Sequence, residues 1–283
     1  MSGDTQPKAG AHSSRGELHI ESLQNERIKN VVKLRERSFR DRMKLLIVED
    51  IRELETALAN NRIPQSVFYC RDFFSGKNER QLIEKCSLAG AETISCSPQV
   101  FAKMAYREHP EGLLALVPQL EIGLADLKLS QEPLIVVAEA VEKPGNLGTI
   151  LRSADAAGVD AVILCDRGAD INNPNVVRAS VGAVFTVQVA GAYSEKAIKW
   201  LRENKIQILA ATPHADLEYT QADLTRGTAI VVGREQEGLS ELWMKSADSQ
   251  VRIPMRGKID SLNVSAATTL LLFEALRQRQ SIT

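Results

Sequence analysis

The sequence predicts an α/β protein with a mostly parallel sheet in its second half and a smaller α/β unit before it. Apolar runs of strand length alternate with segments of helical periodicity along most of the chain. The predicted strands after residue 133 are apolar throughout, which is typical of parallel strands covered by helices on both faces. The 283 residues are enough for two domains of ordinary size.

The first half predicts a compact α/β domain over residues 18–118. Residues 1–17 are small and polar, so we expect a disordered tail. A helix over 19–42 is followed by strands at 44–50, 66–70, 92–96 and 113–118, with helices at 51–60, 80–91 and 97–105 between them. Residues 119–132 show no clear period and are predicted to be a linker.

The second half, residues 133–283, alternates again. Strands are predicted at 133–140, 160–166, 185–190, 206–212, 228–233 and 251–255, and helices near 148–157, 174–183, 194–203, 237–247 and 263–279. Parallel sheets bind ligands outside the carboxyl ends of their strands. The loops after residues 140, 233 and 255 are therefore the candidate sites.

Composition excludes several classes of protein. The net charge is −1, so any contact with nucleic acid must be local. No apolar run reaches the roughly 18 residues of a membrane helix, and the N-terminus has no apolar signal core. The four cysteines and four histidines lack metal-ligand spacing. We expect a cytoplasmic protein with reduced thiols, no metal and no membrane segment.

Three loops carry candidate functional residues. Asn146 is a plausible N-cap before Arg152 in "KPGNLGTILR", although a capped helix with a solvated arginine is the simpler interpretation. Gly233 and Glu235 follow a strand in "VVGREQEG", where the carboxylate could merely favour a helix N-terminus. "SLN" at 261–263 opens a helix that is apolar almost all round, which packing within the monomer or in a dimer would bury.

Together these loops resemble the three motifs of the SpoU (TrmH-like) RNA 2′-O-ribose methyltransferases, within the SPOUT class. The motif N-x-G-x-x-x-R matches Asn146, Gly148 and Arg152, and G-x-E-x-x-G matches the loop at 233–238. I-P-M with S-L-N-x-S matches residues 253–255 and 261–265. The motifs occur in family order over 134–279. Residues 18–118 resemble the family's substrate-binding domain, which is similar to ribosomal protein L30e.

The resemblance implies a C-terminal trefoil knot, a homodimer and S-adenosylmethionine as cofactor. It implies that Arg152 is the catalytic residue at the ribose 2′-hydroxyl, supported by Asn146, Glu235, Ser261 and Asn263. It further implies a cofactor site at Thr212, Gly233, Ile253, Met255 and Leu262. No G-x-G-x-x-G follows a strand, which counts against a dinucleotide cofactor.

A local excess of basic residues predicts an RNA contact. The predicted phosphate-binding residues are Arg27, Lys29, Lys33, Arg35, Arg37, Arg40 and Arg42, with Arg256 and Lys258 near the third loop. A solvated helix face is the alternative interpretation of the first seven.

The resemblance favours S-adenosylmethionine-dependent 2′-O-methylation of RNA as the function. It also implies ribosomal (23S-type) RNA as the substrate, because the family's tRNA enzymes generally carry short helical extensions instead of a separate N-terminal domain. One alternative is a tRNA 2′-O-methyltransferase. The other is a non-catalytic RNA-binding or ribosome-assembly protein with the same fold, which cofactor binding would distinguish.

Overall fold

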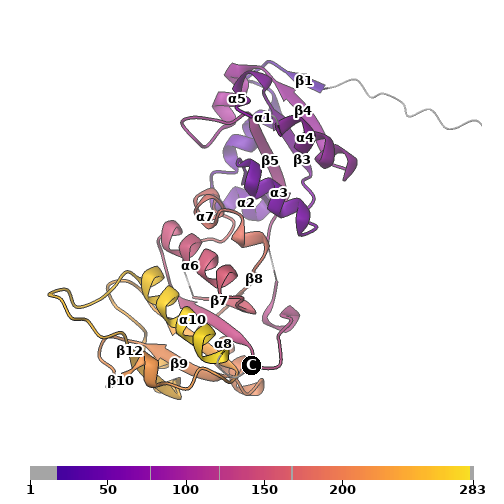
Figure 1. Cartoon of the computed structure of the whole chain (residues 1–283). Coiled ribbons are helices and arrows are strands. Elements are labelled where there is room, and N and C mark those ends of the chain that lie inside the picture. Colours follow the sequence, from indigo (N-terminus) through magenta and orange to yellow (C-terminus); the bar gives the residue numbers. More distant parts are fainter. Residues whose placement is uncertain (1–17, 77, 121, 167, 281–283) are drawn as a thin grey trace, which may run out of the picture.

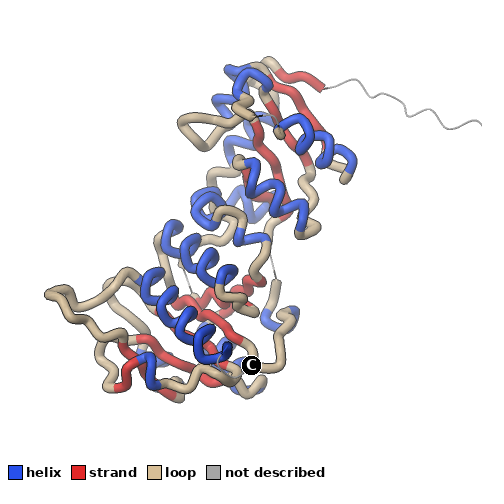
Figure 2. The backbone as a smooth tube through the Cα atoms, viewed as in Figure 1, coloured by secondary structure: helices blue, strands red, loops and turns tan. Residues whose placement is uncertain are grey.

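The computed structural model describes residues 18–76, 78–120, 122–166 and 168–280. Two α/β units follow one another along the chain, and helix α7 lies between them (Figure 1). Each unit is built on its own sheet, with helices packed against it (Figure 2). This arrangement confirms the predicted α/β class and the mostly parallel second sheet.

The N-terminal unit has a five-stranded sheet in the order β1-β4-β3-β5-β2. Strand β5 pairs antiparallel with β2 and β3, and the other pairs are parallel. Its strands are β1 Leu18–Ile20, β2 Leu45–Val48, β3 Ser66–Tyr69, β4 Glu92–Cys96 and β5 Leu113–Pro118. Its helices are α1 Glu26–Lys33, α2 Arg37–Met43, α3 Ile51–Ala59, α4 Glu79–Leu88 and α5 Pro98–Met104.

The predicted helix over 19–42 is wrong as a single element. Strand β1 pairs with β4 at the sheet edge, and the chain turns between α1 and α2. The Arg40 guanidinium donates to the backbone carbonyls of Leu34 and Arg35, both at 2.8 Å, which stabilises the turn. Helix-forming residues fill this segment, so local propensity alone did not reveal the break.

The C-terminal unit has a seven-stranded sheet in the order β10-β12-β9-β11-β6-β7-β8, and all of its strand pairs are parallel. Its strands are β6 Leu134–Glu139, β7 Ala161–Cys165, β8 Gln188–Ala192, β9 Gln207–Ala211, β10 Leu217–Glu218, β11 Thr228–Val232 and β12 Ser249–Arg252. Its helices are α6 Pro144–Ala156, α7 Pro174–Ser180, α8 Ser194–Glu203, α9 Glu241–Ser246 and α10 Val264–Gln280.

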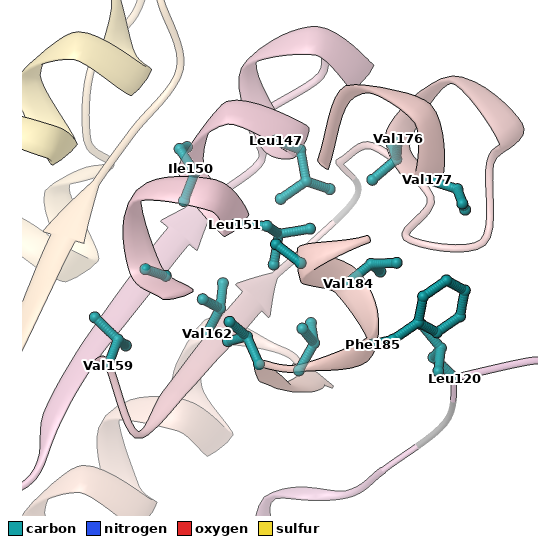
Figure 3. Packing of buried hydrophobic residues seen from close by; sticks show 14 of the residues in the cluster. Leu120, Leu147, Ile150, Leu151, Val159, Val162, Val176, Val177, Val184 and Phe185 are labelled. Carbon is teal, nitrogen blue, oxygen red and sulfur yellow. The ribbon is translucent and has the colours of Figure 1, made fainter. Parts of the chain in front are cut away.

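Helices cover both faces of this sheet because the inner strands are apolar on both sides. Alternate residues of β6, such as Val136 and Ala138, pack with α6, α7 and α10, whereas Ile135 and Val137 pack with α8 and α9. Figure 3 shows the first of these layers, in which Leu147, Ile150 and Leu151 of α6 meet α7 and the turn at 183–185.

Helix α6 begins one turn earlier than the sequence predicted. Pro144 occupies its first turn and Lys143 is its N-cap, so Asn146 lies inside the helix rather than capping it. Proline favours the first helical turn because it has no backbone N–H to satisfy there. The amide side chain of Asn146 is therefore available for contacts outside the helix.

No helix of the described chain is long and apolar enough to cross a membrane. The four cysteines are free and buried. Among the residues that the structure describes, no group of three or more histidine, cysteine or acidic side chains could hold a metal ion.

Candidate active site

The candidate site lies where β6, β9, β11 and β12 end. Register pairs Ala138 with Val232, and Ala211 with Val251, so these four strands end at one edge of the sheet. The segments that follow them carry Asn146, Thr212, Glu235 and the 253–263 loop. The fold thus brings together four stretches, and Asn146 and Asn263 in the first and last of them are 117 residues apart in sequence.

Three side chains, one from each motif, form a hydrogen-bonded chain. The Asn146 amide nitrogen donates to Oε1 of Glu235. The Asn263 amide nitrogen donates to Oδ1 of Asn146 at 3.1 Å. Asn146 therefore uses both ends of its amide, and it links the motif on α6 to the other two loops.

The loop at 233–238 is a closed turn. Arg234 and Gly238 exchange two backbone hydrogen bonds of 3.1 Å, and Gly238 has a φ of +71°, which glycine adopts without strain. A Cβ on Gly233 would lie 2.3 Å from the carbonyl oxygen of Gly238. Only glycine fits at 233 in this turn, which presents Glu235 toward Asn146.

Glu139, which was not among the residues predicted from the sequence, anchors the far end of this loop. Glu139 is 6% exposed, and its carboxylate accepts from the backbone N–H of Ser240 at 2.8 Å. An acidic residue at the end of an otherwise apolar strand was the signal that could have indicated it. Glu139 thereby ties the second motif to the strand that leads to the first.

The third loop offers an apolar surface with open backbone groups. Within the described chain, the backbone groups of residues 254–262 make no hydrogen bond to one another or to other residues. Ile259 is 73% exposed and Leu262 is 39% exposed, while Ile253 and Met255 are half-buried. Exposed apolar side chains beside unused donors and acceptors suit a ligand with a flat heteroaromatic ring.

The other predicted residues of the site have different contacts. Asn263 caps α10, since its Oδ1 accepts from the Ser265 N–H at 3.0 Å and from the Ser265 hydroxyl at 2.6 Å. Ser261 is exposed and makes no hydrogen bond within the described residues. Thr212 donates its backbone N–H to Val251 and so fixes the β9 end of the site.

Arg152 does not join the hydrogen-bonded chain. It lies six residues after Asn146 on α6, about 9 Å along the helix axis at 1.5 Å per residue. Its side chain is exposed and makes no hydrogen bond or ion pair with the described residues. The hydroxyl of Ser153, the next residue, is hydrogen-bonded to that of Thr269 at 2.7 Å, which ties α6 to α10 beside Arg152.

The predicted RNA stripe is only partly available for phosphate. Arg40 is 1% exposed and paired with Asp170 at 2.5 Å, so we correct its assignment as an RNA contact. Arg35 donates to the carbonyls of Lys103, Met104 and Ala105. Arg35 is nevertheless exposed, as are Arg27 (paired with Glu92), Lys33, Arg37, Arg42, Arg256 and Lys258. Lys29, paired with Glu26, is half-buried.

Comparison with known proteins gives two family matches. The SpoU rRNA methylase family matches residues 133–273. The MRM3-like substrate-binding domain matches residues 25–115. The two matches correspond to the two sheets of the fold.

Individual relatives match along most of their length. A 23S rRNA (guanosine-2′-O-)-methyltransferase RlmB of Pectobacterium atrosepticum is 40% identical over 217 residues, covering 72% of this chain and 87% of the relative. A crystal structure of an RNA 2′-O ribose methyltransferase is 40% identical, with a TM-score of 0.81 over 93% of this chain and 100% of that one. An AdoMet-bound rRNA methyltransferase from Sinorhizobium meliloti is 29% identical, with a TM-score of 0.84 over 92% and 97%.

Proposed function

Because this chain belongs to the SpoU rRNA methylase family, we propose that it transfers a methyl group from S-adenosylmethionine to a ribose 2′-hydroxyl of large-subunit ribosomal RNA. The observation that carries the proposal is the chain Asn263–Asn146–Glu235, which joins all three motifs at one sheet edge. Relatives and structural neighbours of known name act on rRNA, and one of them binds AdoMet.

The loops at 212, 233–238 and 253–262 fit this cofactor. Gly233 keeps the 233–238 turn closed, and the open backbone groups of 254–262 can meet the polar edges of an adenine. Ile253, Met255 and Leu262 supply apolar contact. When bound, S-adenosylmethionine supplies a methyl group on a positively charged sulfur, which is already a good leaving group.

The protein then has to align the 2′-hydroxyl and stabilise the charge that develops on its oxygen. A guanidinium keeps its proton at neutral pH, so we assign Arg152 to stabilising the developing alkoxide rather than to removing the proton. A phosphate oxygen of the RNA is our candidate acceptor for that proton. Asn146, Glu235, Ser261 and Asn263 hold the ribose and its phosphates.

We further propose that the chain is a homodimer through the outer surface of α6 and α10. Leu270 and Phe273 are 41% and 46% exposed on α10, which packs against α6. These two side chains are three residues apart and so share one face of the helix, and an exposed apolar helix face can serve as a subunit interface. Dimerisation here would bring Arg152 into the interface, which accounts for its distance from the loops of its own subunit.

The family resemblance also supports a trefoil knot in residues 133–283, an L30e-like fold for residues 18–118 and a cytoplasmic location. Strand β12 lies between β9 and β10 in the sheet and pairs with both. The chain then continues through the 253–263 loop to α10, and this path is compatible with such a knot. An experimental chain trace without threading would contradict the knot. Cell fractionation that finds the protein outside the cytoplasmic fraction would contradict the location.

The test of this function is Arg152→Ala. S-adenosylmethionine affinity, measured by calorimetry, should stay unchanged because Arg152 does not contact the cofactor loops of its own subunit. Methyl transfer to 23S rRNA should fall by about a hundredfold or more, as for loss of one oxyanion-stabilising group. Arg152→Lys keeps the charge and should recover part of the rate. Near-normal turnover in Arg152→Ala would contradict the role, and a wild type that binds no cofactor would favour a non-catalytic RNA-binding protein.

A further inference from the structure

A segment of the C-terminal unit, residues 170–182, contacts the N-terminal unit; we call it the docking segment. At its start, Asp170 Oδ2 lies 2.5 Å from Nη2 of Arg40, and the two side chains are 9% and 2% exposed. The same guanidinium donates to the carbonyls of Leu34 and Arg35. Arg40 is thus held from two sides, and it fixes Asp170 against the turn between α1 and α2.

Three more contacts extend this junction along the docking segment. The Asn172 side chain accepts from the backbone N–H of Leu120 in the linker at 2.9 Å. The Asn175 amide donates to the Tyr106 hydroxyl at 3.0 Å. Gly182 approaches α3 so closely that a Cβ on it would lie 3.0 Å from Oγ1 of Thr56. Each contact joins a different part of the N-terminal unit or the linker to the docking segment.

The hydrophobic core is also continuous across the junction. One cluster of buried side chains contains Leu46, Val48 and Leu54 of the N-terminal unit together with Val176 and Phe185 of the C-terminal unit. Figure 3 shows Leu120 of the linker beside Phe185, and both belong to this cluster. Domains joined by a small polar interface move relative to one another by default, but a buried apolar interface with directed bonds restrains them.

The other side of the docking segment supports the helix that carries the candidate catalytic residues. A Cβ on Gly148 would lie 2.4 Å from the Cβ of Ala179, so α6 and α7 are in backbone-to-backbone contact. Arg152 follows Gly148 by one helical turn on α6. The N-terminal unit is therefore linked to Arg152 through two tightly packed contacts in series.

We propose that Arg40 and Asp170 are positioning residues that set the distance and angle between the RNA-binding unit and Arg152. The enzyme then methylates a ribose at a fixed spacing from the RNA element held by the N-terminal unit. This inference rests on the proposed function for its RNA substrate. A buried ion pair adds little net stability, yet its directed bonds select one arrangement over others. A rigid two-part contact also avoids the entropy cost of ordering a flexible tether on binding.

The test uses the full chain with Arg40→Met and Asp170→Leu together, which removes the directed bonds but keeps apolar volume in the junction. The matched control is Arg202→Met with Asp248→Leu, an exposed arginine–aspartate pair within the C-terminal unit at 2.6 Å. Fluorescent labels at Leu88→Cys and Lys199→Cys report the distance between the units, because both positions are exposed and the native thiols are buried.

We expect the junction variant to broaden the distance distribution and to leave S-adenosylmethionine affinity unchanged. Its kcat/KM on 23S rRNA should fall about tenfold to a hundredfold, as for a small misplacement of substrate, and sequencing should find methylated riboses besides the wild-type one. The control should match the wild type in all four readouts.

An unchanged distance distribution in the junction variant would overturn the inference, whether or not the wild type methylates RNA. A broadened distribution with wild-type kcat/KM and a single methylated ribose would overturn it as well. A wild type without 2′-O-methyl transfer would instead refute the proposed function. The distance distribution would then still show whether Arg40 and Asp170 fix the two units relative to one another. If the junction variant fails to fold, Tyr106→Phe, which removes only the bond from Asn175, should broaden the distribution to a smaller extent.

Discussion

Replacing Asn146 by aspartate tests the hydrogen-bonded chain at the centre of the candidate site. The Asn146 amide donates to the Glu235 carboxylate, and its oxygen accepts from Asn263. Asn146→Asp keeps the size and the accepting oxygen but puts a second negative charge in contact with Glu235. The expected result is a loss of stability that depends on pH, together with a loss of methyl transfer.

The size of the expected stability loss follows from Coulomb's law and from the exposure of the two side chains. Two like charges about 4 Å apart repel by about 4 kcal/mol at an effective dielectric constant of roughly 20. Asn146 and Glu235 are half-buried, so solvent screening reduces the repulsion to about 2 kcal/mol. Uptake of one proton by the two carboxylates of the variant relieves this repulsion. The stability loss of Asn146→Asp relative to the wild type should therefore be largest near pH 8 and should shrink toward pH 5.

Urea denaturation of wild type, Asn146→Asp and Asn146→Ala between pH 5 and pH 8 measures this effect. Asn146→Ala loses the same donor without adding charge, so its deficit of about 1–2 kcal/mol should not change over this range. A deficit of Asn146→Asp that equals that of Asn146→Ala at every pH would refute the contact between Asn146 and Glu235.

Three further predictions test other parts of the account. Gly233→Ala should weaken S-adenosylmethionine binding because its Cβ would collide with Gly238. The control Gly191→Ala, where a Cβ meets nothing within 4 Å, should bind the cofactor as the wild type does. Equal cofactor binding by the two variants would refute the tight turn. Burial first, and the charge of Asp50 second, raise the pKa of Glu53 to about 7, above its ordinary value of 4.5. The folded protein therefore prefers the neutral form of Glu53, and the stability present at acid pH is lost as pH rises through 7. Glu53→Gln should be up to about 3 kcal/mol more stable than the wild type at pH 8 but nearly equal to it at pH 4.5. The control Glu55→Gln, at an exposed position, should not differ from the wild type in stability at either pH. Phe273→Glu should convert the proposed dimer to a monomer in analytical ultracentrifugation, with little change in melting temperature. The control Gln280→Glu should remain a dimer. A wild type that is monomeric at micromolar concentration would rule out the dimer.

Much of the fold could be predicted because local patterns and tertiary contacts agree. The apolar strands β6 and β11 and the helix α8 lie where their sequence patterns predicted, since parallel strands buried on both faces leave a continuous apolar run. Strand β1 could not be predicted because its pairing with β4 defines it. The burial of Arg40 depends on Asp170, which is 130 residues away in sequence.

In the candidate site, too, some features could be predicted from local sequence patterns and others depend on tertiary contacts. Spacing and strand ends indicated Asn146, Glu235 and Asn263, and the structure brings all three together. The position of Arg152 outside that chain depends on the rotation of α6 between α7 and α10, which no local pattern sets. The anchoring role of Glu139 depends on Ser240, which reaches it only because β6 and β11 are neighbours in the sheet.

The most direct test of the central claim is a methyl-transfer assay with labelled S-adenosylmethionine and 23S rRNA from cells that lack this protein. Mapping the label by nuclease digestion and mass spectrometry identifies the modified atom. The account predicts one methyl group on a ribose 2′-oxygen with wild-type protein and almost none with Arg152→Ala. Label on a base, or equal labelling by the two proteins, would contradict it.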